Sequence, residues 1–258
     1  MITDIGRSVG DFTFYKEVPK KTVWATVAYL TMLGGLFSLA VTVAVHQNVA
    51  PRILQAADWT AKTMPTLSLN DGKLTSTVPG PLEIRHPDVP QAGLVVDTLR
   101  TEPVTPAEMS QKKLIAYLTG DAVYVLTPER LETYALGQTK GKESLVVDAA
   151  FYRSMADLLV KVLYPIAFLT SWATFLIWKH VAALIYSLVG LLVNAVVDGG
   201  HEFPTLYRMA VYAQTPVIIL QTAALFLPRP IPLFPLLALL VVTAYLWQAI
   251  RNADPPAA

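Results

Sequence analysis

The chain has 258 residues, of which 53% are apolar and only 15% are charged, and its formal net charge is +1. An average soluble domain carries about 25% charged residues, so this composition indicates a membrane protein. The near-neutral charge argues against a nucleic-acid partner, and the absence of cysteine excludes disulfides, thiol catalysis and Cys-based metal sites.

The N-terminal segment, residues 1–21, is basic and contains three aromatic residues. Its basic residues precede the first apolar run: Arg7, Lys16, Lys20 and Lys21. This composition favours a short cytoplasmic segment at the membrane surface, and a frayed tail is the alternative.

The first apolar run, residues 22–45, predicts transmembrane span 1. It is too long for the apolar region of a signal peptide, so we interpret it as an uncleaved anchor. The basic flank before it places the N-terminus in the cytoplasm. Gly34, Gly35 and Ser38 form a small-residue face that would let another helix approach closely.

Residues 46–157 hold well over half of the charged residues and predict a water-exposed, extracytoplasmic α+β domain. Asn70-Asp71-Gly72 supplies turn chemistry between two short extended segments, and Gly120-Asp121 joins the clearest hairpin of the chain. Thr105 is expected to cap a short helix. Asp148 is expected to cap a helix that continues toward the membrane.

Residues 158–250 predict a bundle of four further spans, at 158–178, 181–197, 210–227 and 231–250, followed by a tail at 251–258. The first two would be separated at Trp178-Lys179-His180, where a charge and an amphipathic ring can lie at the membrane surface. The fold class is therefore an α-helical integral membrane protein of about five spans, with the α+β domain inserted between spans 1 and 2. The alternative is that 158–197 crosses the membrane once and lies in the membrane plane for the rest of its length. It gives four spans and a cytoplasmic C-terminus.

No group of residues in the sequence has the spacing of a reaction centre or a metal site, so we expect neither catalysis nor a cofactor. Lys161 is read as a lysine whose amine reaches the outer membrane surface. The remaining polar or kinked positions are candidate residues for helix contacts or for a cavity between the spans: Asn194, Gln214, Thr215 and Pro216.

Several short motifs resemble a bacterial membrane family known as domain of unknown function 1189. They are residues 65–74 (PTLSLNDGKL), 95–98 (VVDT), 117–121 (YLTGD) and 207–216, which ends YAQTP. The resemblance covers most of the chain and implies a distant similarity to Yip-type multi-span membrane proteins, which act in trafficking and interaction. It brings no active site with it. The outer-domain positions that match the family motifs have a structural interpretation, in which Gly72 adopts a positive-φ turn and Asp97 accepts backbone N–H groups; they are Asn70, Gly72, Asp97 and Thr98.

These observations favour a non-enzymatic protein of the bacterial inner membrane. We expect it to be an accessory subunit or an assembly and stability factor of a larger membrane complex, contacting other integral membrane proteins or a second copy of itself within the lipid bilayer. The alternative is a ligand-sensing or transport component with a cavity between its helices. A self-associating scaffold is a third possibility.

Overall fold

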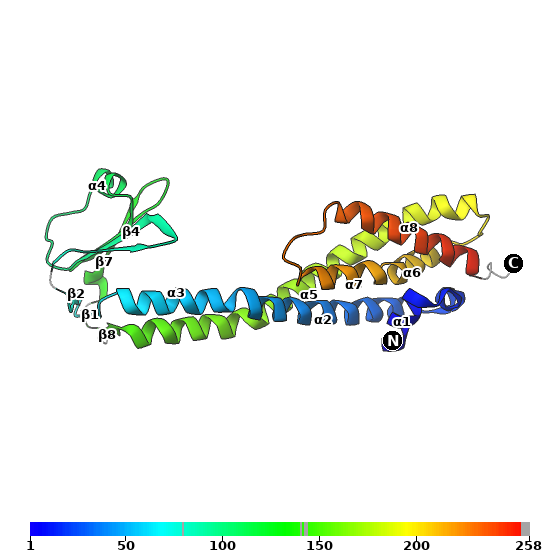
Figure 1. Cartoon of the computed structure of the whole chain (residues 1–258), viewed down its shortest axis with the longest axis horizontal. Helices are drawn as coiled ribbons and strands as arrows, with labels where there is room; N and C mark the ends of the chain where they lie inside the picture. The colour runs from blue at the N-terminus through cyan, green and yellow to red at the C-terminus, as the bar shows by residue number, and fades with distance from the viewer. Residues whose placement is uncertain (79, 140, 142–143, 254–258) are drawn as a thin grey trace. The chain divides into compact units, whose positions relative to one another are not determined.

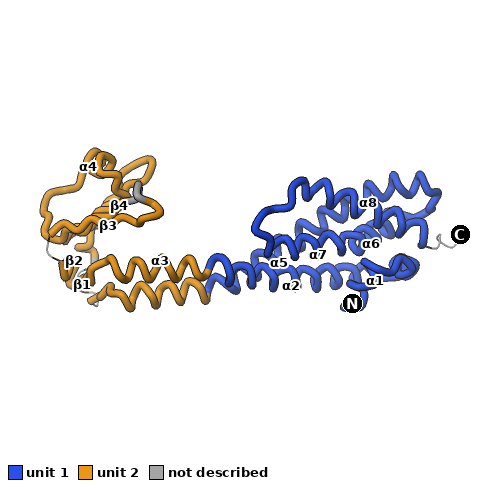
Figure 2. The backbone as a smooth tube through the Cα atoms, viewed as in Figure 1, with its two compact units in different colours: residues 1–49, 162–258 blue, residues 50–161 orange. Residues whose placement is uncertain are grey.

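The computed structural model describes residues 1–78, 80–139, 141 and 144–253, and its helices and strands are shown in Figure 1. The chain forms two compact units, shown in Figure 2: unit 1 comprises residues 1–49 and 162–258, and unit 2 comprises residues 50–161. One helix, α5 (Ala149–Val196), contributes to both units. Each unit is described below by itself.

The described part of unit 1 consists of helices joined by loops. It begins with α1 (Ile2–Gly10) and two short 3-10 helices, η1 (Phe12–Lys16) and η2 (Val18–Lys20). The long helices follow: α2 (Val23–Asn48), the 162–196 part of α5, the consecutive helices α6 (Phe203–Ala213) and α7 (Thr215–Ala224), and α8 (Phe234–Asn252). In Figure 1, α2, α5, the α6–α7 pair and α8 run through unit 1 in alternating directions, so the start of α2 and the end of α8 lie at the same end of the unit.

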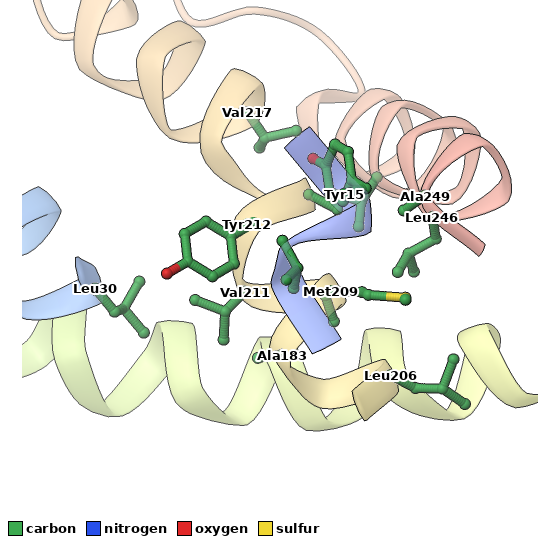
Figure 3. Packing of buried hydrophobic residues seen from close by; sticks show 14 of the residues in the cluster. Tyr15, Leu30, Ala183, Leu206, Met209, Val211, Tyr212, Val217, Leu246 and Ala249 are labelled. Atoms are coloured by element: carbon green, nitrogen blue, oxygen red, sulfur yellow. The ribbon is translucent and has the colours of Figure 1, made fainter. Parts of the chain in front are cut away.

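The core of unit 1 joins the N-terminal segment to the long helices. Phe14, Tyr15 and Val18 are fully buried among residues of α6 and α8, and Figure 3 shows Tyr15 beside these helices. The ring of Tyr212 on α6 lies 4.4 Å from that of Tyr29 on α2, measured between ring centroids. Residues 1–21 are therefore folded and packed, which rules out the frayed-tail alternative.

The break predicted at Trp178-Lys179-His180 is absent, because α5 continues through these residues without interruption. The physical reason is that both polar side chains find partners inside unit 1 and need no membrane surface. Lys179 hydrogen-bonds Gln221, and His180 hydrogen-bonds the hydroxyl of Tyr207. Residues 158–178 and 181–196 thus belong to one helix.

Next to the predicted kink at Thr215-Pro216, the helix is interrupted at Gln214, which lies between the end of α6 at Ala213 and the start of α7 at Thr215. Pro216 lies in the first turn of α7, where its missing N–H costs no helical hydrogen bond.

Unit 2 contains α3 (Ala50–Thr63), two sheets and the beginning of α5. The three-stranded sheet has the order β2-β1-β8, with β1 (Leu67–Asn70), β2 (Lys73–Ser76) and β8 (Leu145–Val147). The five-stranded sheet has the order β3-β4-β5-β6-β7, with β3 (Leu82–His86), β4 (Val89–Asp97), β5 (Leu114–Thr119), β6 (Ala122–Leu126) and β7 (Leu131–Ala135). A short 3-10 helix, η3 (Leu136–Thr139), follows β7.

Both predicted turns of unit 2 join paired strands. Asp71 and Gly72, between β1 and β2, have φ of 48° and 79°. A two-residue hairpin turn that matches the twist of its strands requires such positive φ values. Gly120 lies in the β5–β6 hairpin, where a Cβ would come within 2.7 Å of the Thr98 carbonyl oxygen. Only glycine fits there without a backbone shift.

The five-stranded sheet has a core on each face. Strands β4 and β5 are parallel and are connected through α4 (Pro106–Gln111), whose Met109 is fully buried against Val95 and Tyr117. On the opposite face, Val96 packs with Leu67 and Leu74 of the smaller sheet. The alternation of neighbouring residues between two cores follows from the two-residue period of a strand.

Three helical segments in the described part of the chain are long and apolar enough to cross a membrane. They are Val23–Thr63, which comprises α2 and α3, Ala149–Val196 (α5) and Phe234–Asn252 (α8). The pair α6–α7 falls outside this group because the junction at Gln214 divides it into two short helices.

Candidate binding site around Lys179

The centre of the candidate site is Lys179, the middle residue of the 162–196 part of α5, and its side chain is only 6% exposed. Its Nζ donates a hydrogen bond to Oε1 of Gln221 on α7 at 2.8 Å and lies 5.6 Å from the centroid of the Phe175 ring. A protonated lysine amine has three N–H donors. Among the described residues it has no carboxylate partner and no second acceptor.

Gln214 supplies the second polar group of the site. It is 1% exposed, and its Nε2 donates to the backbone carbonyl of Lys179 at 3.4 Å. Its Oε1 is buried and has no hydrogen-bond partner among the described residues. A buried acceptor left without a donor costs about 1–3 kcal/mol, so the site has unused hydrogen-bonding capacity of both kinds.

Two cavities meet at Lys179 and Gln221, and Trp178 borders both. The first, of about 510 Å³, lies between α2 and α5; its lining is completed by Phe37, Val41, Ala167, Thr170, Ser171, Thr174 and Phe175. The second, of about 350 Å³, lies between α5, α7 and α8; its lining is completed by Ala182, Ile185, Tyr186, Gln214, Val217, Phe234, Pro235, Ala238 and Leu239. Both volumes fall in the range of about 300–1,000 Å³ that is typical of ligand pockets.

Thr215, which we predicted as a contact or cavity residue, holds the N-terminal segment and α2 to the α6–α7 junction. Its hydroxyl donates to the Tyr212 carbonyl at 2.7 Å and shares a 2.8 Å hydrogen bond with the hydroxyl of Tyr29. That tyrosine hydroxyl also lies 3.3 Å from Oγ of Ser8. Thr215 therefore joins three elements and does not line either cavity.

The small residues of α2 differ in their surroundings. A Cβ on Gly34 would come within 3.0 Å of the Phe175 ring, so this glycine permits the close approach of α2 to α5. Gly35 has open space around it, and Ser38 is fully buried with an unpaired Oγ. Gly34 and the buried Ser38 are therefore positioned as the prediction of a helix contact requires, whereas Gly35 has no neighbour around it in the described structure.

Asn194 does not belong to the site. Its side chain forms two hydrogen bonds with the backbone of His201, each of 3.2 Å, and thereby closes the loop between α5 and α6. The structure thus brings Gln214 to the cavities, leaves Pro216 at the kink, and places Asn194 at a separate loop.

Unit 2 contains another polar cluster, around Arg100. Its guanidinium forms a two-pronged pair with Glu108 at 2.8 and 2.9 Å and also donates to the hydroxyl of Tyr117 at 3.2 Å. The hydrogen bonds from Arg100 lower the pKa of Glu108 to about 2. Asp97 accepts from the Tyr117 hydroxyl at 3.2 Å, which corrects the expectation that it accepts backbone N–H groups.

This cluster has a structural role, because Arg100 also donates to the backbone carbonyls of Glu102 and Pro103. These bonds hold the connection between β4 and α4 against the sheet. The other family-motif positions are structural as well: Asn70 pairs with Lys73 across the hairpin that contains Gly72, and the Thr98 carbonyl faces Gly120.

Sequence reasoning missed Lys179 and Gln221 as site residues. Lys179 had been assigned to a span boundary, because a charge inside a long apolar run is the usual sign of one. The signal that could have found the site is the coincidence of one lysine in α5 with two glutamines, Gln214 and Gln221, seven residues apart on the following apolar segment.

Among the described residues, no group of three or more His, Asp or Glu side chains could hold a metal ion. The fold and the site together define a class: a predominantly helical chain with helices able to cross a membrane, an α+β unit, and a polar site buried between apolar helices.

The family is shown by a comparison with protein-family models. The chain belongs to the family described as protein of unknown function DUF1189, whose model matches residues 4–250. This match confirms the resemblance noted in the sequence. No curated protein and no solved structure matches the chain.

Proposed function

We propose that the chain is an integral protein of the bacterial inner membrane whose helical unit binds a ligand between its helices, as a ligand-sensing or transport component. In this proposal α2, the 162–196 part of α5, the α6–α7 pair and α8 each cross the bilayer once. The chain then has four spans, both ends lie in the cytoplasm, and unit 2 is extracytoplasmic.

The distribution of basic residues supports this orientation. The start of α2 and the end of α8 lie at one end of unit 1, where the N-terminal basic residues also lie. Arg208 donates a 2.9 Å hydrogen bond to the Lys21 carbonyl, and Arg251 is in the last turn of α8. Basic residues gathered at one end are typical of the cytoplasmic side.

The observation that carries the ligand-binding function is the buried Lys179 amine with a single neutral acceptor, Gln221. An ionisable residue within a membrane span is expensive, and it usually faces a substrate path or pairs with an opposite charge. Helix packing alone does not account for this residue, because an apolar side chain would fill the same space at lower cost.

Native mass spectrometry of the full-length protein, released from its own membranes in a mild detergent, tests this proposal. We expect a retained small molecule on the wild-type protein and on a Lys161→Met variant, since Lys161 is an exposed lysine of the same helix. We expect the molecule to be lost from Lys179→Met. Equal retention by both variants, or none by the wild type, would contradict the proposal.

The accessory-subunit hypothesis is the second candidate, and one observation favours it. Within unit 2, α5 exposes Met155, Leu158 and Leu159 by 49%, 54% and 54%, at positions that lie on one face of a helix. Such a face fits a contact with another protein. Co-purification of an unrelated membrane protein in fixed ratio, lost when Leu158 and Leu159 are replaced by Ser, would support this candidate.

A further inference from the structure

We infer that the ligand of the Lys179 site is a single-chain amphiphile with a carboxylate head, of the chemical class of a long-chain fatty acid. This inference deepens the proposed function and rests on it. It assigns the head group to the polar residues where the two cavities meet, and the hydrocarbon chain to the apolar walls.

The head group is indicated by the hydrogen-bonding capacity of the site. Lys179 has spare N–H donors beyond the one used by Gln221. The side-chain amide of Gln221 uses only its oxygen in that bond, so its Nε2 donors are also available. The two oxygens of a carboxylate can accept from an ammonium and an amide together, and such charge-assisted bonds are the stronger kind.

Gln214 adds a hydrogen-bond acceptor to the donors of the head-group site. Its buried Oε1 lacks a donor among the described residues, and the residue lines the 350 Å³ cavity together with Lys179 and Gln221. A carboxylic acid in its protonated form carries an O–H that can donate to such an oxygen. The site therefore offers hydrogen-bonding groups to the head group in either protonation state.

The charge of the site favours a monoanion over a phosphate monoester. Lys179 is the only Lys, Arg or His among the described residues that line the two cavities. A phosphate monoester carries nearly two charges, and phosphate groups are commonly bound by arginine or by several donors. A carboxyl group can enter an apolar region in its neutral form, because burial favours the uncharged acid.

The tail is indicated by the walls of the cavities. Ile185, Val217 and Leu239 line one cavity, and Phe37 and Val41 line the other. An apolar wall on each side of one polar centre matches a molecule with one charged end and one hydrocarbon chain.

Trp178 provides a direct reporter because it borders both cavities. The experiment titrates the full-length protein, in a nonionic detergent, with 9,10-dibromostearic acid and separately with its methyl ester. The bromine atoms quench the fluorescence of a tryptophan that they contact. The Trp178→Phe variant identifies the Trp178 signal. Trp24→Phe is the matched control, because Trp24 is also exposed (81%, against 63% for Trp178) and lines neither cavity, so the site is reported by the difference between acid and ester at Trp178.

We expect the acid to quench Trp178 at a concentration about tenfold lower than the ester. The Lys179→Met variant should lose this preference, Lys179→Arg should keep most of it, and Lys161→Met should not change it. The comparison of acid with ester on the wild-type protein needs no variant, so it stands even where a substitution impairs folding.

The other outcomes separate this inference from the proposed function. Equal quenching by acid and ester would overturn the assignment of a carboxylate head group and leave the binding function intact. The same conclusion would follow if neither compound quenched Trp178 while native mass spectrometry showed another molecule whose retention depends on Lys179. No quenching, together with no Lys179-dependent ligand in native mass spectrometry, overturns both.

Discussion

The clusters around Arg100 and Lys179 each contain one cationic side chain, but they differ in the number of hydrogen-bond acceptors around that cation. Arg100 in unit 2 has a carboxylate, a hydroxyl and two backbone carbonyls as acceptors. Lys179 in unit 1 is more deeply buried and has one amide oxygen. A cation whose donors are all used stabilises the fold around it, whereas a cation with unused donors remains available to a ligand.

The largest effect on stability is expected from Arg100→Met, which removes both bonds to Glu108 and those to the β4–α4 connection. We expect a loss of about 2 kcal/mol in the stability of unit 2, because hydrogen bonds to charged groups contribute about 1.5–3 kcal/mol. Hydrogen exchange of the β5 amides in the whole protein measures it. The control is Arg130→Met, whose side chain is 74% exposed and whose loss should change stability by less than about 0.5 kcal/mol. Equal protection in the two variants would make the Arg100 cluster dispensable.

Acid should produce a smaller effect at the same cluster. Because the pKa of Glu108 is lowered from 4.5 to about 2, its pairing stabilises unit 2 fully above about pH 4.5 and is lost as the pH falls toward 2. Protonation leaves the bonds from Arg100 to the carbonyls of Glu102 and Pro103 in place, so the loss is partial. Hydrogen exchange between pH 5 and 2.5, corrected for the intrinsic pH dependence of exchange, measures it. The Arg100→Met variant should show a flatter dependence, and an unchanged slope would contradict this assignment.

Tyr29→Phe tests the contribution of a buried neutral hydroxyl in unit 1 that has hydrogen-bond partners within the protein. The substitution removes the hydroxyl that bonds Thr215 and Ser8, while the ring contact with Tyr212 remains. We expect a loss of about 1 kcal/mol, seen as a lower thermal midpoint in detergent. Tyr134→Phe, at an exposed strand residue, is the control and should leave the midpoint unchanged. A midpoint for Tyr29→Phe equal to the wild type would show that the Tyr29 hydroxyl does not contribute to the stability of unit 1.

The smallest effect is expected from Lys179→Met in the absence of ligand. Replacing a poorly paired buried cation by an apolar side chain of similar length is neutral or slightly stabilising, so the thermal midpoint should stay the same or rise. The control is again Lys161→Met. A fall comparable to that of Arg100→Met would mean that Lys179 is a structural residue, and the contrast between the two clusters would fail.

The sequence predicted well those features that depend on neighbouring residues. The turns at Gly72 and Gly120 and the caps at Thr105 and Asp148 are present, with Thr105 accepting from the Glu108 N–H and Asp148 from the Phe151 N–H. The helix interruption at Gln214, beside Pro216, is also local. In each case a residue type fixes the backbone within a few positions.

The candidate site could not be predicted in this way, because its partners are distant in the sequence. Gln221 is 42 residues from Lys179, and Tyr207 is 27 residues from His180. Seen along the chain, Lys179 and His180 are polar interruptions of an apolar run, which indicate a span boundary. Only the packing of α5 against α6 and α7 shows that both residues are inside the helical unit.

The most direct test of the central claim is an experimental density map of the full-length protein in a lipid nanodisc prepared from its native membrane. We predict continuous, elongated density that ends within hydrogen-bond distance of the Lys179 amine and follows the apolar walls of one of the two cavities. A map in which both cavities are filled by side chains, or in which a carboxylate of this protein pairs with Lys179, would contradict the claim that this residue binds a ligand.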